Sequence, residues 1–185
     1  MVAVAALLAV TLLGAIATFL VDDEHAAKFA TAVSTIPLVG SVAMYYVYLT
    51  DYQNVGNALL SPETVAFRQS IDWIELGGYT LQYSVGLDGV SMPLLTLTGV
   101  LTTLALVSSW TPIDERQSQF YGLMLLMEVS LIGVFAALDF FLWFVFWEGV
   151  LIPMYLLIGI WGGPRRKYAA IKFFVYTNVA SLVMF

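Results

Sequence analysis

The stretch LDFFLWFVFWEGVLIPM at Leu138–Met154 decides the fold class of this chain. It is almost wholly aliphatic and aromatic, yet it contains one glutamate, Glu148, and one proline, Pro153. The apolar segment around it, Phe140–Trp161, is long enough to cross the hydrocarbon core of a bilayer, which takes about 20 residues. The stretch therefore predicts a transmembrane helix that carries a carboxylate inside the membrane.

Working outward from this stretch, similar apolar runs recur along the chain. They are Val2–Val21, Phe29–Thr50, Val90–Trp110, Phe120–Leu138 and Tyr168–Phe185. The chain has 185 residues, of which 61% are hydrophobic and 11% are charged, against about 25% charged in a soluble domain. A bilayer removes the problem of exposing so much apolar surface, because lipid then solvates the outer faces. We predict an all-α membrane protein with about six transmembrane helices, in contact with the lipid bilayer.

The two ends of the chain bear on its domain organisation. No positively charged region precedes the first run and no small-residue cleavage site follows it, so we predict a retained helix rather than a signal peptide. The last run stops at Phe185 inside its own apolar pattern. We expect residues 1–185 to form a single N-terminal membrane domain that is cut short within its sixth helix.

The one long connection, residues 51–89, is polar. Within it, Ser70–Leu76 and Tyr79–Val85 are rich in aromatic and β-branched residues and are separated by Gly77-Gly78. Two glycines between two such runs are typical of a two-residue hairpin turn. The connection is therefore predicted to form a small β-hairpin outside the membrane.

The composition also excludes several kinds of site. There is no cysteine, which excludes disulfides and thiolate metal sites. No cluster of histidines and carboxylates has the spacing of metal ligands, and the only histidine, His25, lies in an acidic segment. Haem would need axial His or Met ligands, but the seven methionines are scattered and the predicted spans contain no histidine. No basic patch is large enough for nucleic acid. We expect no bound cofactor, no metal and no nucleic-acid partner.

Lysine and arginine predict the orientation of the helices. Six of the seven lie at one end of an alternating bundle, and Arg68 alone lies at the other. These six are Lys28, Arg116, Arg165, Arg166, Lys167 and Lys172. Because positive residues favour the cytoplasmic side, we predict a multi-pass protein of the cell membrane, with its N-terminus and its hairpin outside.

Two glutamates lie inside predicted spans, where a charge is costly and is a functional candidate by default. Glu148 follows the turn residue Asp139 by nine positions, which places it about 13 Å into the core. Glu128 precedes Asp139 by 11 positions, about 16 Å deep on the same rise per residue. The two therefore share a depth near the middle of the bilayer, and they would titrate as a coupled pair if they face each other. The alternative for each is a structural carboxyl bonded to a neighbouring hydroxyl or backbone group.

Two further residues have open interpretations. Pro153 leaves the carbonyl of Gly149 without its helical hydrogen bond, which provides either a site for an ordered water in a proton path or a simple packing kink. Lys172 lies near the start of the sixth span. It is either a lysine that extends to the interface or a charge at the mouth of a proton path.

Four stretches together resemble one family. LDFFLWFVFWEGVLIPM resembles the antiporter-like membrane subunits of proton-pumping NADH:quinone oxidoreductase, or complex I, and among them the group called chain M or subunit 4. The other three matching stretches are GLDGVSMPLLTLTG at Gly86–Gly99, Ser109-Trp110, and the WGG and KYAAIKFFVYT motifs that lead through Lys167–Thr177.

The resemblance implies a fold and a set of site residues. Such subunits have about fourteen helices and no redox cofactor of their own, and they move protons while electron transfer takes place in other subunits. The family's essential fifth-helix glutamate corresponds to Glu148, and the lysine of its KFF motif corresponds to Lys172. Glu128 stands where some relatives are also acidic. The family's seventh-helix lysine has no counterpart in these 185 residues.

Three hypotheses for the function follow. The first is a proton-translocating subunit of a respiratory NADH:quinone oxidoreductase or of its deazaflavin-linked archaeal counterpart, with other membrane subunits as partners. The second is a subunit of a multisubunit cation/proton antiporter, since the glutamate helix is common to both families. The third is a split-gene product with a structural role only.

Overall fold

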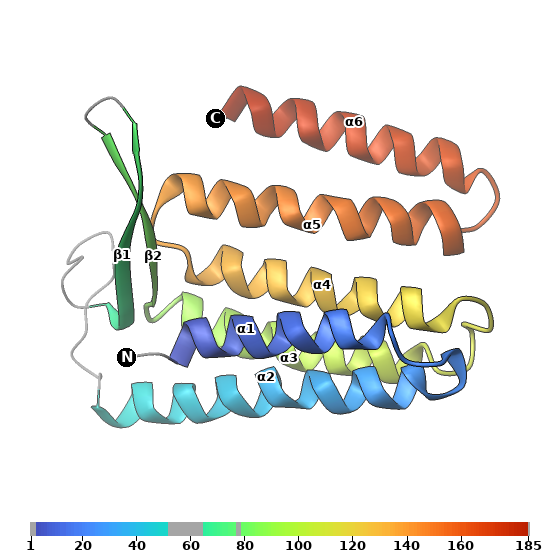
Figure 1. The fold of residues 1–185 in the computed structure, drawn as a ribbon, viewed down its shortest axis with the longest axis horizontal. Helices are drawn as coiled ribbons and strands as arrows, with labels where there is room; N and C mark the ends of the chain where they lie inside the picture. The colour runs from blue at the N-terminus through green and yellow to red at the C-terminus, as the bar shows by residue number, and fades with distance from the viewer. Residues whose placement is uncertain (1–2, 52–64, 77–78, 185) are drawn as a thin grey trace.

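In the computed structural model, the described residues form six helices that run back and forth and a two-stranded sheet that lies across one end of the bundle (Figure 1). The structure describes residues 3–51, 65–76 and 79–184. In chain order the elements are α1 (Ala3–Thr18), α2 (Asp23–Asp51), β1 (Ala66–Leu76), β2 (Tyr79–Leu87), α3 (Ser91–Ser108), α4 (Gln117–Ala136), α5 (Phe140–Trp161) and α6 (Arg166–Met184). Each of the six predicted apolar runs holds one helix, so the predicted helical architecture with a small hairpin is confirmed.

Four of the described helices, α2 to α5, are long and apolar enough to cross a membrane. The described part of α1 is apolar but has only 16 residues. α6 has 19 residues and carries three basic side chains in its first two turns. α2 begins six residues earlier than the predicted span, at Asp23, because its acidic first turn suits the positive end of the helix dipole.

The interior is organised around α4, which packs on α1, α2, α3 and α5. Two apolar clusters lie one above the other along the bundle. The cluster near the hairpin contains Leu8, Met44, Leu95, Val129 and Ile132 among others. The cluster near the opposite end contains Ala15, Val33, Leu106, Tyr121 and Leu125 among others.

Helices α4 and α5 approach each other closely at two small residues. A Cβ atom on Gly133 would lie 2.2 Å from ring atoms of Phe146, and one on Gly149 would lie 3.0 Å from the hydroxyl oxygen of Ser130. Small residues are the usual means by which membrane helices pack closely. The second of these contacts fixes α5 against α4 at the residue next to Glu148.

The hairpin is longer than predicted at its open end. β1 and β2 pair antiparallel from Leu76 and Tyr79 down to Ala66 and Leu87, with two register shifts that place 11 residues of β1 opposite nine of β2. The predicted strands at Ser70–Leu76 and Tyr79–Val85 are confirmed, whereas the predicted turn at Gly77-Gly78 lies outside the described residues.

The base of the hairpin is joined to the turn between α4 and α5. The backbone N–H of Leu138 donates to the carbonyl of Ser84 at 2.8 Å, and Val85 and Ala137 form an antiparallel bridge. The ring of Trp73 on β1 lies 6.3 Å from that of Phe141 on α5. The turn that sets the depth of both glutamates is therefore held by the sheet.

The opposite end of the bundle brings three connections together: α1–α2, α3–α4 and α5–α6 (Figure 1). The carboxylate of Asp23 accepts from the N–H of Ser118 at 2.8 Å, and the indole of Trp161 donates to the carbonyl of Glu115 at 2.9 Å. These bonds tie the connections to one another on the side where the basic residues gather.

Candidate functional site

Glu148 lies near the middle of α5, on the side that faces α6. Asp139 begins this helix, because its carboxylate accepts from the N–H of Leu142 at 3.0 Å. Glu148 follows a little over two turns later and is half-buried. One carboxylate oxygen, Oε2, accepts a hydrogen bond from the side-chain amide of Asn178 on α6 at 2.9 Å. The other, Oε1, is buried and has no hydrogen-bond partner in the described part of the chain.

A second side-chain bond joins the same two helices one residue earlier on α5. The indole N–H of Trp147 donates to the hydroxyl of Ser181 at 3.0 Å, and this hydroxyl donates to the carbonyl of Thr177. Asn178 and Ser181 are three positions apart on α6 and therefore lie on one face of that helix. The two bonds fix the rotation of α6 relative to Glu148.

Glu128 lies in a different environment, in the interior of the bundle on α4. Its exposed fraction is 0%, and neither carboxylate oxygen has a hydrogen-bond partner among the described residues. It occupies the level between the two apolar clusters, since Leu125 before it belongs to one and Val129 after it belongs to the other. A buried carboxyl with no partner is expensive, and such a group is stable only in its neutral form or with a bound ligand.

The level of Glu128 holds several other buried polar side chains. Thr11, Ser34, Thr98 and Ser130 each donate to a carbonyl three or four residues back on the same helix. Thr102, also buried, lies one turn past Thr98 on α3. Hydroxyls from α1, α2, α3 and α4 thus interrupt the apolar core where the carboxyl sits.

The two glutamates are not bonded to each other. Glu148 bonds to α6, while both oxygens of Glu128 are without partner in the described structure. The two glutamates thus lie at corresponding levels of two antiparallel helices but in separate surroundings. Whether the two side chains face each other depends on how α4 and α5 are rotated about their axes, and the spacing of residues along the sequence does not predict that rotation.

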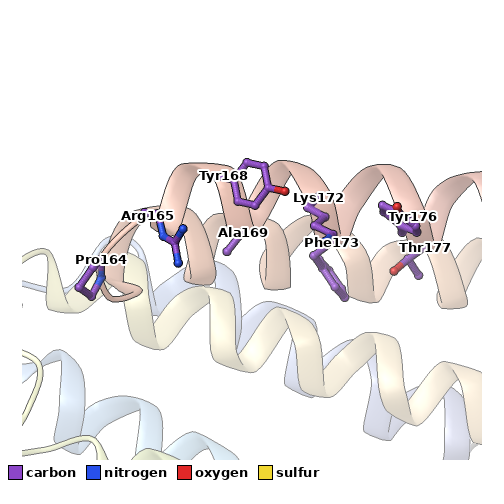
Figure 2. A pocket seen from close by; sticks show the side chains of 8 residues that line it. All are labelled: Pro164, Arg165, Tyr168, Ala169, Lys172, Phe173, Tyr176 and Thr177. Carbon is purple, nitrogen blue, oxygen red and sulfur yellow. The ribbon is translucent and has the colours of Figure 1, made fainter.

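Lys172 lies on the exposed side of α6, away from both carboxylates. Its ammonium lies 5.9 Å from the centre of the Tyr168 ring and 5.7 Å from that of Tyr176, within reach of cation–π attraction. Figure 2 shows Lys172 on α6 among the residues that line a shallow hollow, together with Arg165, Tyr168 and Tyr176. The structure thus separates the lysine from the glutamates, and no described ion pair joins them.

Pro153 lies inside α5, which continues unbroken from Phe140 to Trp161. Its side chain is buried, so it packs within the bundle. The carbonyl of Gly149, which proline cannot bond, belongs to the residue next to Glu148.

Asn178 is the residue of this site that sequence reasoning did not single out. It is an uncharged amide within an apolar run, and only its contact with Glu148 in the structure identifies it as a site residue. A signal was present, because an amide inside a predicted span needs a polar partner across a helix interface.

These features define an apolar helical membrane protein with a carboxyl near the middle of each of two neighbouring helices. Residues 137–185 match the family model described as NADH:quinone oxidoreductase/Mrp antiporter, TM. This matched segment, which contains α5 and α6, belongs to the family of antiporter-like membrane subunits.

Named relatives are similar over almost the whole chain. One is F(420)H(2) dehydrogenase subunit M of Methanosarcina mazei, 39% identical over 179 residues, covering 96% of this chain and 34% of the relative. Another is NAD(P)H-quinone oxidoreductase chain 4 2 of Microcystis aeruginosa, 39% identical over 177 residues, covering 94% of this chain and 30% of the relative. The chain spans about a third of the length of these curated relatives.

A solved structure has the same fold. It is the membrane-bound sulfane sulfur reductase, an archaeal respiratory membrane complex, with a TM-score of 0.70 and 19% sequence identity. The match covers 96% of this chain and 26% of the other, so it bears on the fold of the whole described bundle. The family match and the named relatives, rather than this structure, confirm the resemblance to the complex I membrane subunits.

Proposed function

We propose that this chain contributes a proton-translocating element to a respiratory NADH:quinone or deazaflavin:quinone oxidoreductase. The names of its relatives, which are quinone oxidoreductase and F(420)H(2) dehydrogenase subunits, support this class of complex. The observation that carries the proposal is Glu148, a carboxylate near the middle of an apolar helix with one oxygen bonded to Asn178 and one buried without a partner.

The chemistry follows from how surroundings change a carboxyl's affinity for a proton. Removal from water favours the neutral acid, whereas a nearby cation favours the carboxylate. A positive side chain that approaches and leaves Glu148 during turnover therefore makes it release and take up a proton. The free oxygen Oε1 is the atom at which that proton is exchanged, because Oε2 is occupied by Asn178.

Glu128 is the second proposed member of the path, and Lys172 is the third. Glu128 lies at a similar depth and both its oxygens are free, so it can hold a proton or bonded water. Lys172 lies on the outer face of α6 near the basic end of the bundle, where it provides positive charge at the mouth of the path. The chain's own residues provide protonatable groups only, and electron transfer belongs to other subunits.

The test is proton translocation in membranes that carry the assembled complex. Glu148→Gln keeps the size of the side chain and removes its titratable proton, so we expect pumping coupled to quinone reduction to fall by about an order of magnitude or more. Glu128→Gln should reduce it less, and Lys172→Ala less than Glu148→Gln. Normal pumping by an assembled Glu148→Gln complex would leave Glu148 a structural residue.

The same proposal includes an orientation and partners. The six basic residues at the end of the bundle formed by the α1–α2, α3–α4 and α5–α6 connections support a cytoplasmic position for that end. Cysteine substituted for Arg166 should react with an impermeant reagent only from the cytoplasmic side, and cysteine substituted for Ile71 only from the outside. The reverse result would contradict the orientation. The partners are other membrane subunits of the complex and the lipid bilayer.

Cation/proton exchange is the second candidate, because the matching family includes Mrp antiporters. The discriminating measurement adds an inhibitor of electron transfer. Sodium-driven proton movement that persists with the inhibitor would favour the antiporter, whereas movement that stops with electron transfer favours the oxidoreductase.

A further inference from the structure

We propose that Asn178 is a positioning residue for Glu148: it holds the carboxyl group in one orientation and sets the pH range over which it exchanges its proton. This inference rests on the proposed proton-carrying role of Glu148. It assigns a role to a residue on α6 whose significance is visible only in the packed structure.

The geometry allows the amide of Asn178 to orient the carboxyl group of Glu148. The nitrogen Nδ2 of Asn178 donates to Oε2 of Glu148 at 2.9 Å, the usual length of a good N–H···O bond. The other oxygen is buried and free. The bond therefore selects which oxygen carries the exchangeable proton and directs it away from α6.

An amide suits this position because it can serve both states of the carboxyl. Its N–H can donate to an ionised carboxylate, and its carbonyl oxygen can accept from the neutral acid after the amide turns over. Asparagine has no charge of its own and does not titrate. It can thus accompany each change of protonation without exchanging a proton itself.

The charged groups near this pair are few. On α4, the titratable group of the core is Glu128, which shares no hydrogen bond with Glu148. On α6, the charged group nearest in sequence is Lys172, which lies between Tyr168 and Tyr176 on the exposed side. Among the described residues, Asn178 is the side chain that hydrogen-bonds to Glu148, so its removal is the direct way to change the surroundings of that carboxyl.

The experiment measures the pH profile of proton translocation by the assembled complex. Asn178→Leu keeps the branched shape and the number of side-chain heavy atoms and removes the donor. Because a donated hydrogen bond favours the ionised form, we expect the half-maximal point of the profile to move about one pH unit toward alkaline pH, a tenfold change in proton affinity. Asn178→Gln restores an amide at this site and should return the profile most of the way to that of the unmodified chain.

The matched control is Ser181→Ala. It breaks the neighbouring bond between α5 and α6, that of the Trp147 indole, and leaves the carboxyl of Glu148 untouched. We expect it to leave the pH profile in place. If the Asn178→Leu complex does not assemble, Asn178→Ser, whose hydroxyl is too short to reach Oε2, gives the same test.

The outcomes separate this inference from the proposed function. If Glu148→Gln abolishes pumping while Asn178→Leu leaves the profile unchanged, Asn178 is not a positioning residue and the role of Glu148 stands. If Ser181→Ala shifts the profile as much as Asn178→Leu, general packing of α6 is responsible and the inference is wrong. If Glu148→Gln pumps normally, the proposed function fails, and the inference fails with it.

Discussion

Helices α4 and α5 each carry a glutamate near their middle, yet they differ in how far other helices cover them. In an apolar 18-residue window of each helix, 61% of the residues of α4 are buried, against 17% of those of α5. Glu128 is accordingly fully buried, whereas Glu148 is half-buried and hydrogen-bonds to Asn178 on α6. A carboxyl enclosed by a packed core keeps its surroundings, while one at the edge of a bundle can gain and lose a charged neighbour.

The largest effect on assembly is expected from a substitution that forces α4 and α5 apart. In Gly133→Leu, the new side chain would occupy space now filled by the Phe146 ring. Overpacking of this kind costs about 1–3 kcal/mol or more, and we expect little assembled complex in the membrane, as measured by native gel electrophoresis.

Gly163→Ala is the control for that substitution. A Cβ atom on Gly163 would meet nothing within 4 Å, so this variant should assemble normally. Full assembly of Gly133→Leu would show that α4 and α5 can separate without consequence.

The next effect distinguishes the two glutamates by stability. Glu128→Leu removes two buried oxygens that have no partner and fills the space with an apolar side chain, so we expect the free energy of unfolding to stay level or rise by about 1 kcal/mol. Glu148→Leu breaks the bond to Asn178 and leaves that amide without an acceptor, which should lower it by about 1–3 kcal/mol.

Thermal unfolding of the purified complex in detergent compares the two leucine variants directly. Opposite signs are the expected result. A large loss of stability in Glu128→Leu would mean that Glu128 has a partner that stabilises it, such as a bonded water network.

The smallest effect should be that of Ser181→Ala. It removes the acceptor of the Trp147 indole at the half-covered interface of α5 and α6. A single neutral hydrogen bond contributes about 1 kcal/mol, so the midpoint of thermal unfolding should fall by only a few degrees. A fall as large as that of Gly133→Leu would show that this interface, rather than α4–α5, holds the helices together.

Much of the fold could be predicted from sequence, because it follows from local pattern. Length and hydropathy place six helices, and the two aromatic runs on either side of Gly77-Gly78 predict the hairpin strands. Asp139 fixes the start of α5 through its own cap to Leu142. The strand ends beyond Val85 were not predicted, because Leu87 pairs with Ala66 across a register shift that the sequence pattern does not contain.

The site was less accessible to prediction. Its depth in the membrane follows from 1.5 Å per residue, so Glu128 and Glu148 could be placed at one level. Which way each side chain points depends on how the helices are rotated against one another, and close contacts at Gly133 and Gly149 determine that. Asn178 was missed for the same reason.

The packing of α1 has a consequence for how this protein is made. α1 is synthesised before the other described helices, yet it packs more extensively on α4 than on α2, and α4 begins about a hundred residues later, at Gln117. Until α4 has been synthesised and inserted, α1 lies in the lipid without the helix on which it packs most extensively. Its buried threonines make this tolerable, since Thr11 and Thr18 donate their hydroxyl hydrogens to the carbonyls of Leu7 and Gly14 within α1 itself. α1 can therefore lie in the membrane before α4 is inserted, because these two hydroxyls are already hydrogen-bonded within the helix.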